Sequence, residues 1–453
     1  MTTQHDSADD LSDFSEILEA EIDFSDQSAS RHADPRIRRR WIRAFLVVGL
    51  VIVLVLGSVG AYVVWVLTAP VNAAAVSLRE PAVPTPEAAV IALPADGASI
   101  VNIVGGDEYL GGDESGAWLA SGPDESRSIA SISKLITALV VLDAKPLADA
   151  ADPGPTITFD KAAHDLYDKY YVMGATIAPM PTGTSMSEYD ALATMLIPSA
   201  SNYAEAVSTW AFGSQGAFVG AARTWLNANG LDNTTIVEPT GISPSNTSTP
   251  SDLMTIARLV DANPALKNIV ATSSISVPGG GTAFNTNDLL GVDGIDGLKT
   301  GNLGAGQFNL LYTATLPVGI DEPLRVTGVA LGGASHDSVN AGVRAALDDI
   351  RAGFHDVPLI ESGEVVGSYS TPWGSTAQLV VGSDAAIFTW SDTPIELTMD
   401  TWDPTEYVDG EEVGSLTWTA GPNTATAPLE LKGSIEPPTA WWRLTHPDQL
   451  GSQ

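Results

Sequence analysis

The sequence predicts one N-terminal transmembrane helix, an α+β domain with an antiparallel sheet flanked by helices, and a small C-terminal all-β domain. Three observations support this. A charge-free apolar run covers residues 44–67, and helical and strand-like patterns are mixed over residues 96–356. Short apolar runs broken by Gly, Pro, Asp and Ser fill residues 357–453. At 453 residues, the chain is also longer than one hydrophobic core usually organises.

The apolar run at residues 44–67 is long enough to cross a bilayer as a helix of about 20 residues. Five arginines precede it between Arg36 and Arg43, and the next positive charge is Arg79. The positive-inside rule therefore places the N-terminus in the cytoplasm and the rest of the chain outside, in a single-pass cell-membrane protein. A cleaved signal peptide is the alternative, because Ala73, Ala74 and Ala75 are small, but signal cores are typically only about 7–15 residues long.

Two segments flank the predicted membrane helix. Residues 1–43 form an acidic cytoplasmic tail, expected to be disordered, that ends in the basic run beside the membrane. Residues 68–95 contain Pro70, Pro81, Pro84 and Pro86 and show little periodicity. This composition predicts an extended linker between the membrane and the first folded domain.

The α+β domain, residues 96–356, begins with a strand-like run at 100–104 and a buried helix at 129–142. Further helices are predicted at 187–197, opened by the capping-box pattern of Ser187 and Asp190, and at 204–226. Strands are predicted at 308–316 and 324–331, followed by a helix at 337–354 whose apolar residues share one face. The all-β domain is predicted from runs at 376–381, 395–399 and 416–419.

Charge and cysteine content exclude several classes of function. The chain has 55 acidic and 21 basic residues, a net charge of −34, which repels phosphate backbones and argues against a nucleic-acid partner. It has no cysteine, so disulfides, thiolate metal sites and cysteine nucleophiles are excluded. The six histidines are scattered and lack metal-ligand spacing. We therefore expect no metal and no cofactor.

The first candidate catalytic pair is Ser131 and Lys134, at the start of the predicted buried helix. Residues three apart share a helix face, so the Lys134 amine can reach the Ser131 hydroxyl. The positive end of the helix dipole favours negative charge developing nearby. A serine near a helix start is more often a cap than a nucleophile, so the pair needs support from other motifs.

The second motif is Lys299-Thr300-Gly301, which precedes the strand predicted at 308–316. The chain has only seven lysines, so two lysines in motifs of matching chemistry are unlikely to be a coincidence. A lysine and a threonine side by side on a strand can bind a substrate carboxylate. The glycine lets a substrate backbone lie close to the strand. A solvated lysine in a turn is the alternative.

The third motif is expected to be a Ser-x-Asn sequence, and the best candidate begins at Ser199. It is imperfect, because Ser201 stands where the asparagine belongs and Asn202 follows one residue later. S-x-x-K, S-D-N and K-T-G together are typical of β-lactamases and penicillin-binding proteins. Neighbouring side chains on a helix point about 100° apart, so Ser201 is preferred over Asn202 as the replacement.

With these motifs, the chain resembles the low-molecular-mass penicillin-binding proteins of the D-alanyl-D-alanine carboxypeptidase family. The resemblance runs from about residue 100 to the C-terminus, and the motifs have the family's order and spacing. The matching stretches are residues 129–138, 195–204, 248–253 and 294–301. The resemblance implies a β-lactamase/transpeptidase-like fold with a helical subdomain and a cleft between the two parts. It also implies that the β-rich block is an added C-terminal domain.

The resemblance further implies a reaction and its residues. Ser131 would attack the bond between the two terminal D-alanines of a peptidoglycan stem peptide, with Lys134 as base and Ser199 as proton relay. The backbone N–H groups of Ser131 and Asn302 would form the oxyanion hole. The substrate would be bound by Ser201, Asn202, Lys299, Thr300, Gly301 and Asn302. β-Lactams would be covalent inhibitors.

Three alternatives remain. A Ser-His-Asp hydrolase is unsupported, because Ser335, His336 and Asp337 are consecutive and cannot form a triad. A class A β-lactamase-like hydrolase would need a Glu followed four residues later by Asn, and position 242 after Glu238 is Ile. The missing asparagine at Ser201 motivates the third alternative, a membrane-tethered cell-wall or penicillin-binding protein without turnover.

Overall fold

The structure is a computed structural model that describes residues 35–111 and 117–451. Most of the acidic tail, residues 1–34, lies outside this range. The described chain divides into two compact units. The first contains the N-terminal helix with residues 371–375 and the segment from Glu436 onward, and the second contains the α+β part and the β-rich part.

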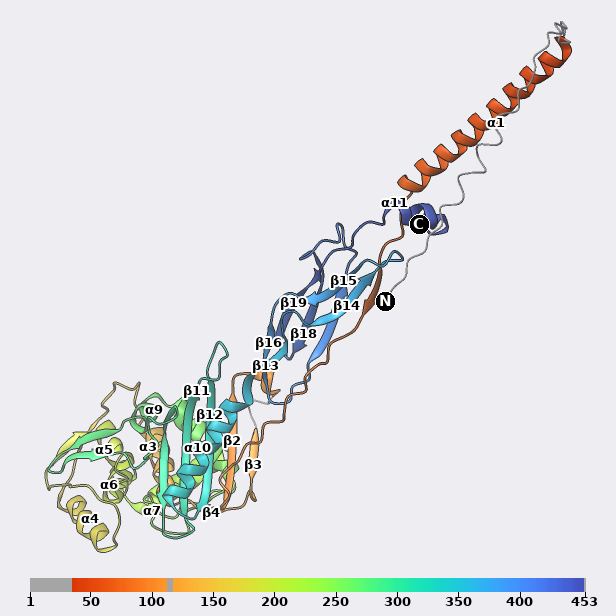
Figure 1. The fold of residues 1–453 in the computed structure, drawn as a ribbon. Coiled ribbons are helices and arrows are strands. Elements are labelled where there is room, and N and C mark those ends of the chain that lie inside the picture. Colours follow the sequence, from red (N-terminus) through yellow and green to blue (C-terminus); the bar gives the residue numbers. More distant parts are fainter. Residues whose placement is uncertain (1–34, 112–116, 452–453) are drawn as a thin grey trace, which may run out of the picture. The chain divides into compact units, whose positions relative to one another are not determined.

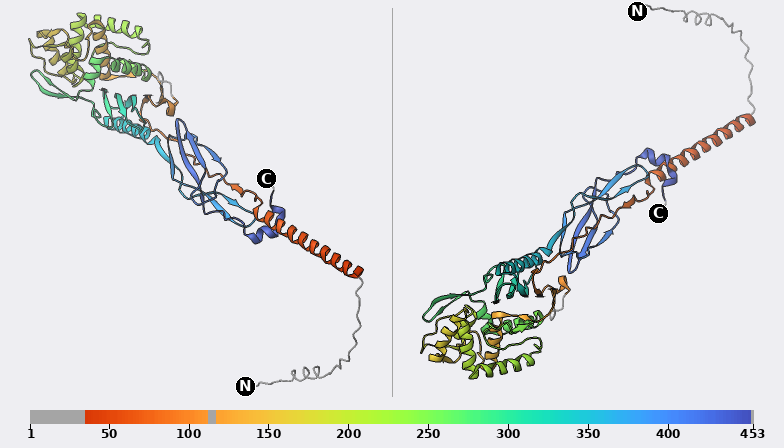
Figure 2. Two further views of the ribbon diagram at one scale, coloured as in Figure 1. Left: turned by 90° about the horizontal axis from the view of Figure 1, so that it is seen from above. Right: turned by 90° about the horizontal axis from the view of Figure 1, so that it is seen from below.

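The first unit is built on α1, a helix of 34 residues at Pro35–Thr68. It is long and apolar enough to cross a membrane, and it includes the whole predicted span at 44–67. The unit also contains the short helices α11 (Ala440–Thr445) and η2 (Pro447–Gln449). In both views of Figure 2, the C-terminal segment lies beside the end of α1.

A five-stranded antiparallel sheet organises the α+β part, with the strand order β10-β11-β12-β2-β3. Its strands are β2 (Ala98–Val104), β3 (Leu119–Ser121), β10 (Ile295–Asn302), β11 (Phe308–Leu316) and β12 (Leu324–Gly333). Neighbouring residues of a strand face opposite sides, so Leu310 and Leu311 belong to different cores. The sheet is therefore covered on both faces.

One face of the sheet is covered by α10 (His336–Gly353), which Figure 1 shows lying across it. Its apolar side chains at 339, 343, 347 and 350 pack on Leu310, Tyr312 and Val326. Phe354, the next residue, joins the same core. The pattern that predicted this helix therefore also predicted the face that it buries.

The other face carries the larger core and the helices that complete the domain. Those helices are α3 (Ser133–Ala144), α4 (Lys161–Val172), α5 (Glu188–Leu196), α6 (Ser201–Phe212), α7 (Gln215–Ala228), α8 (Pro250–Ala262) and α9 (Pro264–Val270). All of α3 from residue 133 to 142 is buried, which is typical of a central core helix. Smaller elements complete the part, namely α2 (Asp107–Leu110), β4 (Arg127–Ser128), β5 (Thr156–Thr158), β6 (Ser185–Ser187), β7 (Thr247–Ser248), β8 (Ser274–Val277) and β9 (Gly281–Phe284).

The β-rich part contains a six-stranded sheet of order β1-β14-β15-β19-β18-β17 and the pair β13-β16. Its strands are β13 (Phe354–Ile360), β14 (Val365–Ser370), β15 (Thr376–Val381), β16 (Ala385–Trp390), β17 (Glu396–Thr401), β18 (Glu412–Ala420) and β19 (Asn423–Lys432). The edge strand β1 (Ala75–Leu78) comes from the segment expected to be a linker. Part of that segment is therefore ordered by pairing with the β-rich domain.

The predicted fold class is confirmed, and one predicted element is wrong. The pattern at residues 204–226 predicted one helix, but the structure has α6 and α7, separated at Gly213 and Ser214. Gly213 ends α6 in the left-handed conformation, with φ 83°. The Ser214 side chain then accepts a hydrogen bond from the backbone N–H of Ala217 and caps α7.

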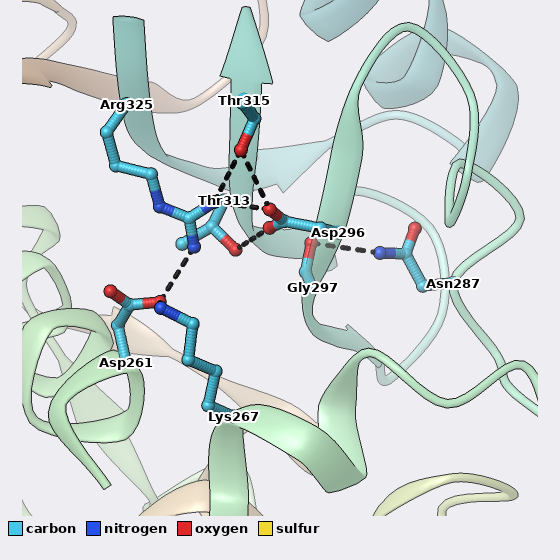
Figure 3. A network of polar contacts seen from close by, with 8 residues as sticks. All are labelled: Asp261, Lys267, Asn287, Asp296, Gly297, Thr313, Thr315 and Arg325. Atoms are coloured by element: carbon cyan, nitrogen blue, oxygen red, sulfur yellow. Dashed lines mark hydrogen bonds and ion pairs between the residues drawn. The ribbon is translucent and has the colours of Figure 1, made fainter. Parts of the chain in front are cut away.

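A polar network fixes β10, the strand that carries the Lys-Thr-Gly motif (Figure 3). Asp296 of β10 accepts hydrogen bonds from Thr313 at 2.6 Å and Thr315 at 3.2 Å, and it pairs with Arg325 of β12. The same arginine pairs with Asp261 of α8 at 2.7 Å. Because these residues lie on three strands and a helix, the network holds the register of β10.

Candidate active site

A cleft of about 450 Å³ contains the candidate nucleophile and most of the predicted site residues. Of the predicted residues, Ser131, Ser199, Ser201, Thr300, Gly301 and Asn302 line it. Lys134 and Lys299 are almost completely buried in the protein around the cleft, with exposed fractions of 0% and 1%. The cleft thus brings together residues from three distant parts of the sequence.

Ser131 lies in the 3-10 helix η1 (Ala130–Ile132), which leads directly into α3. Lys134 Nζ donates hydrogen bonds to Ser131 Oγ at 2.9 Å and to the carbonyl oxygen of Thr240 at 2.6 Å. The two side chains therefore meet as the three-residue spacing predicted. The 3-10 turn places Ser131 at the cleft while Lys134 remains inside the core.

Burial lowers the pKa of Lys134 from its usual 10.5 to about 7, and the negative charge of Glu238 opposes this effect. A substantial fraction of Lys134 is consequently a neutral amine at neutral pH. Such an amine can accept a proton from the Ser131 hydroxyl that it contacts. A fully buried lysine in contact with a cleft serine is a well-formed nucleophile and base pair.

The segment around Glu238 holds Lys134 in place. The Glu238 carboxylate accepts hydrogen bonds from the backbone N–H groups of Thr240 and Gly241, both at 2.7 Å. The carbonyl of Thr240 is the one that accepts from Lys134. Glu238 does not line the cleft, so its position gives no support to a β-lactamase-like role for it.

Two glycines allow close approach to the nucleophile. A Cβ atom at Gly301 would lie 2.6 Å from the carbonyl oxygen of Ile129 and 3.3 Å from the backbone nitrogen of Ser131. A Cβ atom at Gly241 would lie 1.9 Å from the carbonyl oxygen of Ala130. Any larger residue at either position would displace the backbone around Ser131.

The backbone around the two candidate catalytic serines, Ser131 and Ser199, is strained at two residues. Ala130, just before Ser131, has φ 49°, and Ser199 has φ 65°. These left-handed conformations cost non-glycine residues roughly 1–3 kcal/mol each and are concentrated at functional sites. Ser199 lies in the turn between α5 and α6, and its conformation accompanies its position at the cleft.

Ser201 and Asn202 have different environments. Ser201 begins α6 and lines the cleft, and its backbone N–H donates to the carbonyl of Thr176 at 2.8 Å. Asn202 is fully buried, and its amide bonds the backbone of Ala178 in both directions, at 2.8 and 3.1 Å. Asn202 therefore holds the backbone of Ala178 and is not among the residues that line the cleft.

Lys299 and Thr300 meet a residue that the sequence did not indicate. Thr286 Oγ1 accepts from Lys299 Nζ at 3.0 Å and lies 2.7 Å from Thr300 Oγ1. Burial, together with repulsion from Lys134, lowers the pKa of Lys299 well below its usual value. A bound carboxylate would stabilise the charged form of Lys299.

His336 also lines the cleft, although the sequence gave no role for it. Its ring packs edge-on against Phe308, with ring centroids 4.8 Å apart. Among the described residues, no hydrogen bond joins the His336 side chain to a serine and an aspartate as a Ser-His-Asp triad would require. Across residues 35–111 and 117–451, no three His, Asp or Glu side chains cluster as a metal site would require.

The fold and the site together define a class of protein. A buried lysine contacts a serine at the start of a core helix, and a Lys-Thr-Gly strand forms one side of the cleft. These features define a serine acyl-transfer enzyme with the penicillin-binding fold.

Comparison with known proteins agrees with this class. The sequence profile described as D-alanyl-D-alanine carboxypeptidase matches residues 112–333. Over these residues the chain is similar to the D-alanyl-D-alanine carboxypeptidase family, as its motifs indicated.

Two curated relatives and one solved structure illustrate the similarity. D-alanyl-D-alanine carboxypeptidase DacD of Salmonella typhimurium is 24% identical over 60% of this chain and 71% of the relative. A D-alanyl-D-alanine endopeptidase of Pseudomonas aeruginosa is 35% identical over 29% of this chain and 39% of the relative. Penicillin binding protein 6B of Escherichia coli has a TM-score of 0.51 and 20% identity, over 77% of this chain and 99% of that chain.

Proposed function

We propose that this chain is a membrane-anchored serine D-alanyl-D-alanine carboxypeptidase that removes the terminal D-alanine from peptidoglycan stem peptides. One observation carries the proposal: Lys134 Nζ is fully buried and 2.9 Å from Ser131 Oγ, at a cleft that Thr300 and Gly301 also line. The chain's similarity to the carboxypeptidase family over residues 112–333 supports the choice of substrate.

Acylation begins when neutral Lys134 accepts the proton of Ser131 as Oγ attacks the carbonyl between the two D-alanines. The oxyanion is bound by the backbone N–H groups of Ser131 and Asn302. Ser199 relays the proton to the leaving amine, and D-alanine departs. Water then hydrolyses the ester of Ser131, which releases the shortened peptide and restores the enzyme.

Substrate binding is assigned to other residues in and around the cleft. Lys299 and Thr300 hold the terminal carboxylate, which predicts a requirement for a free C-terminus. Ser201 takes part of the role that asparagine has in the family, but its hydroxyl donates only one hydrogen bond. Asn202 contributes indirectly, through the Ala178 segment that it holds.

The activity assay separates turnover from mere binding. The full chain should release D-alanine from a peptide ending in D-Ala-D-Ala and should release none from the same peptide with a C-terminal amide. Release is measured as free D-alanine over time, with Ser131→Ala as the background. A rate equal to that background would favour the non-catalytic cell-wall-binding alternative.

The membrane helix is proposed to remain uncleaved, with its arginine-rich end in the cytoplasm. Arg443 of α11 donates to the carbonyl oxygens of Val66 and Ala69 at 3.3 and 2.7 Å, at the C-terminal end of α1. A cation is favourable at that negative end of the helix dipole. Val66, Ala69 and Leu450 are buried together. The helix end is thus part of a folded unit, which supports its retention.

A disulfide test checks this docking. Val71 and Leu450 form an antiparallel bridge, and the chain has no native cysteine. Val71→Cys combined with Leu450→Cys should therefore form an intrachain disulfide on mild oxidation of membranes, because bridged strand residues have a suitable separation. Non-reducing gel mobility detects the closed loop. Each single variant is the matched control.

Two results would contradict the proposal of a retained anchor. Thiols that both remain open to alkylation in the double variant would show that the C-terminal segment does not dock on α1. A mature protein that lacks Val71 by mass spectrometry would show that the helix is a cleaved signal peptide.

A further inference from the structure

Thr286 is the described residue whose hydroxyl contacts both side chains of the carboxylate-binding pair. It lies in the loop between β9 and β10 and lines the cleft. Its Oγ1 atom is 3.0 Å from Lys299 Nζ and 2.7 Å from Thr300 Oγ1. The hydroxyl therefore bridges the two groups assigned to the substrate carboxylate.

The backbone on both sides of Thr286 is fixed by asparagines. Asn285 donates to the carbonyls of Val270 and Thr272 at 3.3 and 3.0 Å. Asn287 donates to the carbonyl of Gly297 in β10 at 3.3 Å, a contact drawn in Figure 3. The backbone N–H of Thr286 itself donates to the carbonyl of Ile197 at 3.2 Å. Thr286 is held by three separate parts of the fold, so its hydroxyl has a defined position.

The number of protons determines the direction of the hydrogen bonds. A charged lysine can only donate, so Thr286 Oγ1 accepts from Lys299 when Lys299 is an ammonium. The Thr286 hydroxyl has one proton, and Thr300 Oγ1 at 2.7 Å is the acceptor placed to receive it. The Thr300 proton is then free to point into the cleft. The carbonyl oxygen of Thr286 could also accept the Thr300 proton, but it lies 3.5 Å from Thr300 Oγ1, at the limit of a hydrogen bond.

We propose that Thr286 is a positioning residue that orients the Thr300 hydroxyl and the Lys299 ammonium toward the terminal carboxylate of the substrate. The inference rests on the proposed function and extends it with a specificity-determining residue outside the three motifs. Thr286 acts through Lys299 and Thr300 and has no part in the chemistry at Ser131. Its loss should therefore weaken reactions with carboxylate-bearing ligands selectively.

The test compares two reagents on Thr286→Val in the full chain. The first reagent is benzylpenicillin, which carries a carboxylate, and the second is a neutral phosphonofluoridate that reacts with activated serines. Valine keeps the shape of threonine and removes the hydroxyl. We expect the second-order rate of Ser131 acylation by benzylpenicillin to fall about 10- to 100-fold, as for loss of a hydrogen bond to a charged group. The rate with the phosphonofluoridate should change less than about threefold.

Three variants serve as controls. Thr286→Ser keeps the hydroxyl and should restore the benzylpenicillin rate to within about threefold of the parent chain. Thr282→Val changes an exposed threonine on β9 and should leave both rates unchanged. Thr286→Ala provides a second hydroxyl deletion if the valine variant does not fold, which thermal unfolding checks.

The possible outcomes distinguish this inference from the proposed function. Equal losses with both reagents, or no loss with either, would overturn the positioning role of Thr286. The same holds if serine fails to restore the rate. A parent chain whose Ser131 reacts with neither reagent would overturn the proposed function and the inference together. A KM increase for the D-Ala-D-Ala peptide in Thr286→Val, with kcat less affected, would support the inference.

Discussion

Replacing Ser131 with alanine is expected to abolish covalent labelling by a fluorescent penicillin and to stop D-alanine release. The variant keeps the backbone of η1 but removes the oxygen that Lys134 contacts at 2.9 Å. Without that oxygen no acyl-enzyme can form, so activity should fall by at least about 10³-fold. Gel fluorescence after denaturation measures the covalent adduct directly.

The matched control for this experiment is Ser128→Ala. Ser128 lies in β4, three residues before the nucleophile, and its buried hydroxyl has no hydrogen-bond partner among the described residues. Its loss should leave labelling intact. Label that persists in Ser131→Ala would show that another residue is the nucleophile.

The acylation rate is expected to rise with pH and to be half-maximal near pH 7. Lys134 can act as base only in its neutral form, and burial places its pKa at about 7. Below that pH the amine is protonated and cannot accept the Ser131 proton, whereas above it the neutral form dominates. Penicillin acylation rates between pH 5 and 9 measure this profile.

Lys134→Gln should lower the acylation rate and remove the dependence of that rate on pH. Loss of a positioned base costs about 10²- to 10⁴-fold, and the residual rate should be nearly flat across neutral pH. Lys161→Gln is the control, because Lys161 is exposed on α4 and pairs only with Asp165 in the contacts found for it. A Lys134→Gln profile that still rises through pH 7 would assign the titration to a different group.

The sequence predicted those features that depend on local pattern. A strand-like run followed by turn residues predicted β11 at the bounds observed, and the apolar face of residues 339–350 predicted both α10 and the core it joins. The three-residue spacing of Ser131 and Lys134 predicted their contact. In each case neighbouring residues contain the information, because the periodicity of a helix or strand determines which side chains meet.

The features that the sequence did not predict depend on contacts between distant segments or on a single local break. Thr286 contacts Lys299 and Thr300 because its loop folds beside β10. The sequence around Thr286 does not indicate these contacts. The sequence places His336 only in the run Ser335-His336-Asp337, which cannot form a triad, yet α10 brings His336 to the cleft. Gly213 and Ser214 did signal the break between α6 and α7, but the apolar pattern on both sides obscured it.

In the proposed membrane-anchored protein, the docking of Arg443 and Leu450 on the end of α1 affects how proteases could release the enzyme. A protease that cuts once between β1 and β2 severs one connection, but the catalytic domain remains joined through the β-rich domain to the docked segment. A single cut between β19 and Glu436 leaves the catalytic domain joined to α1 through the segment that contains β1. If the anchor is retained as proposed, release therefore takes two cuts, and enzyme cut once stays attached to α1.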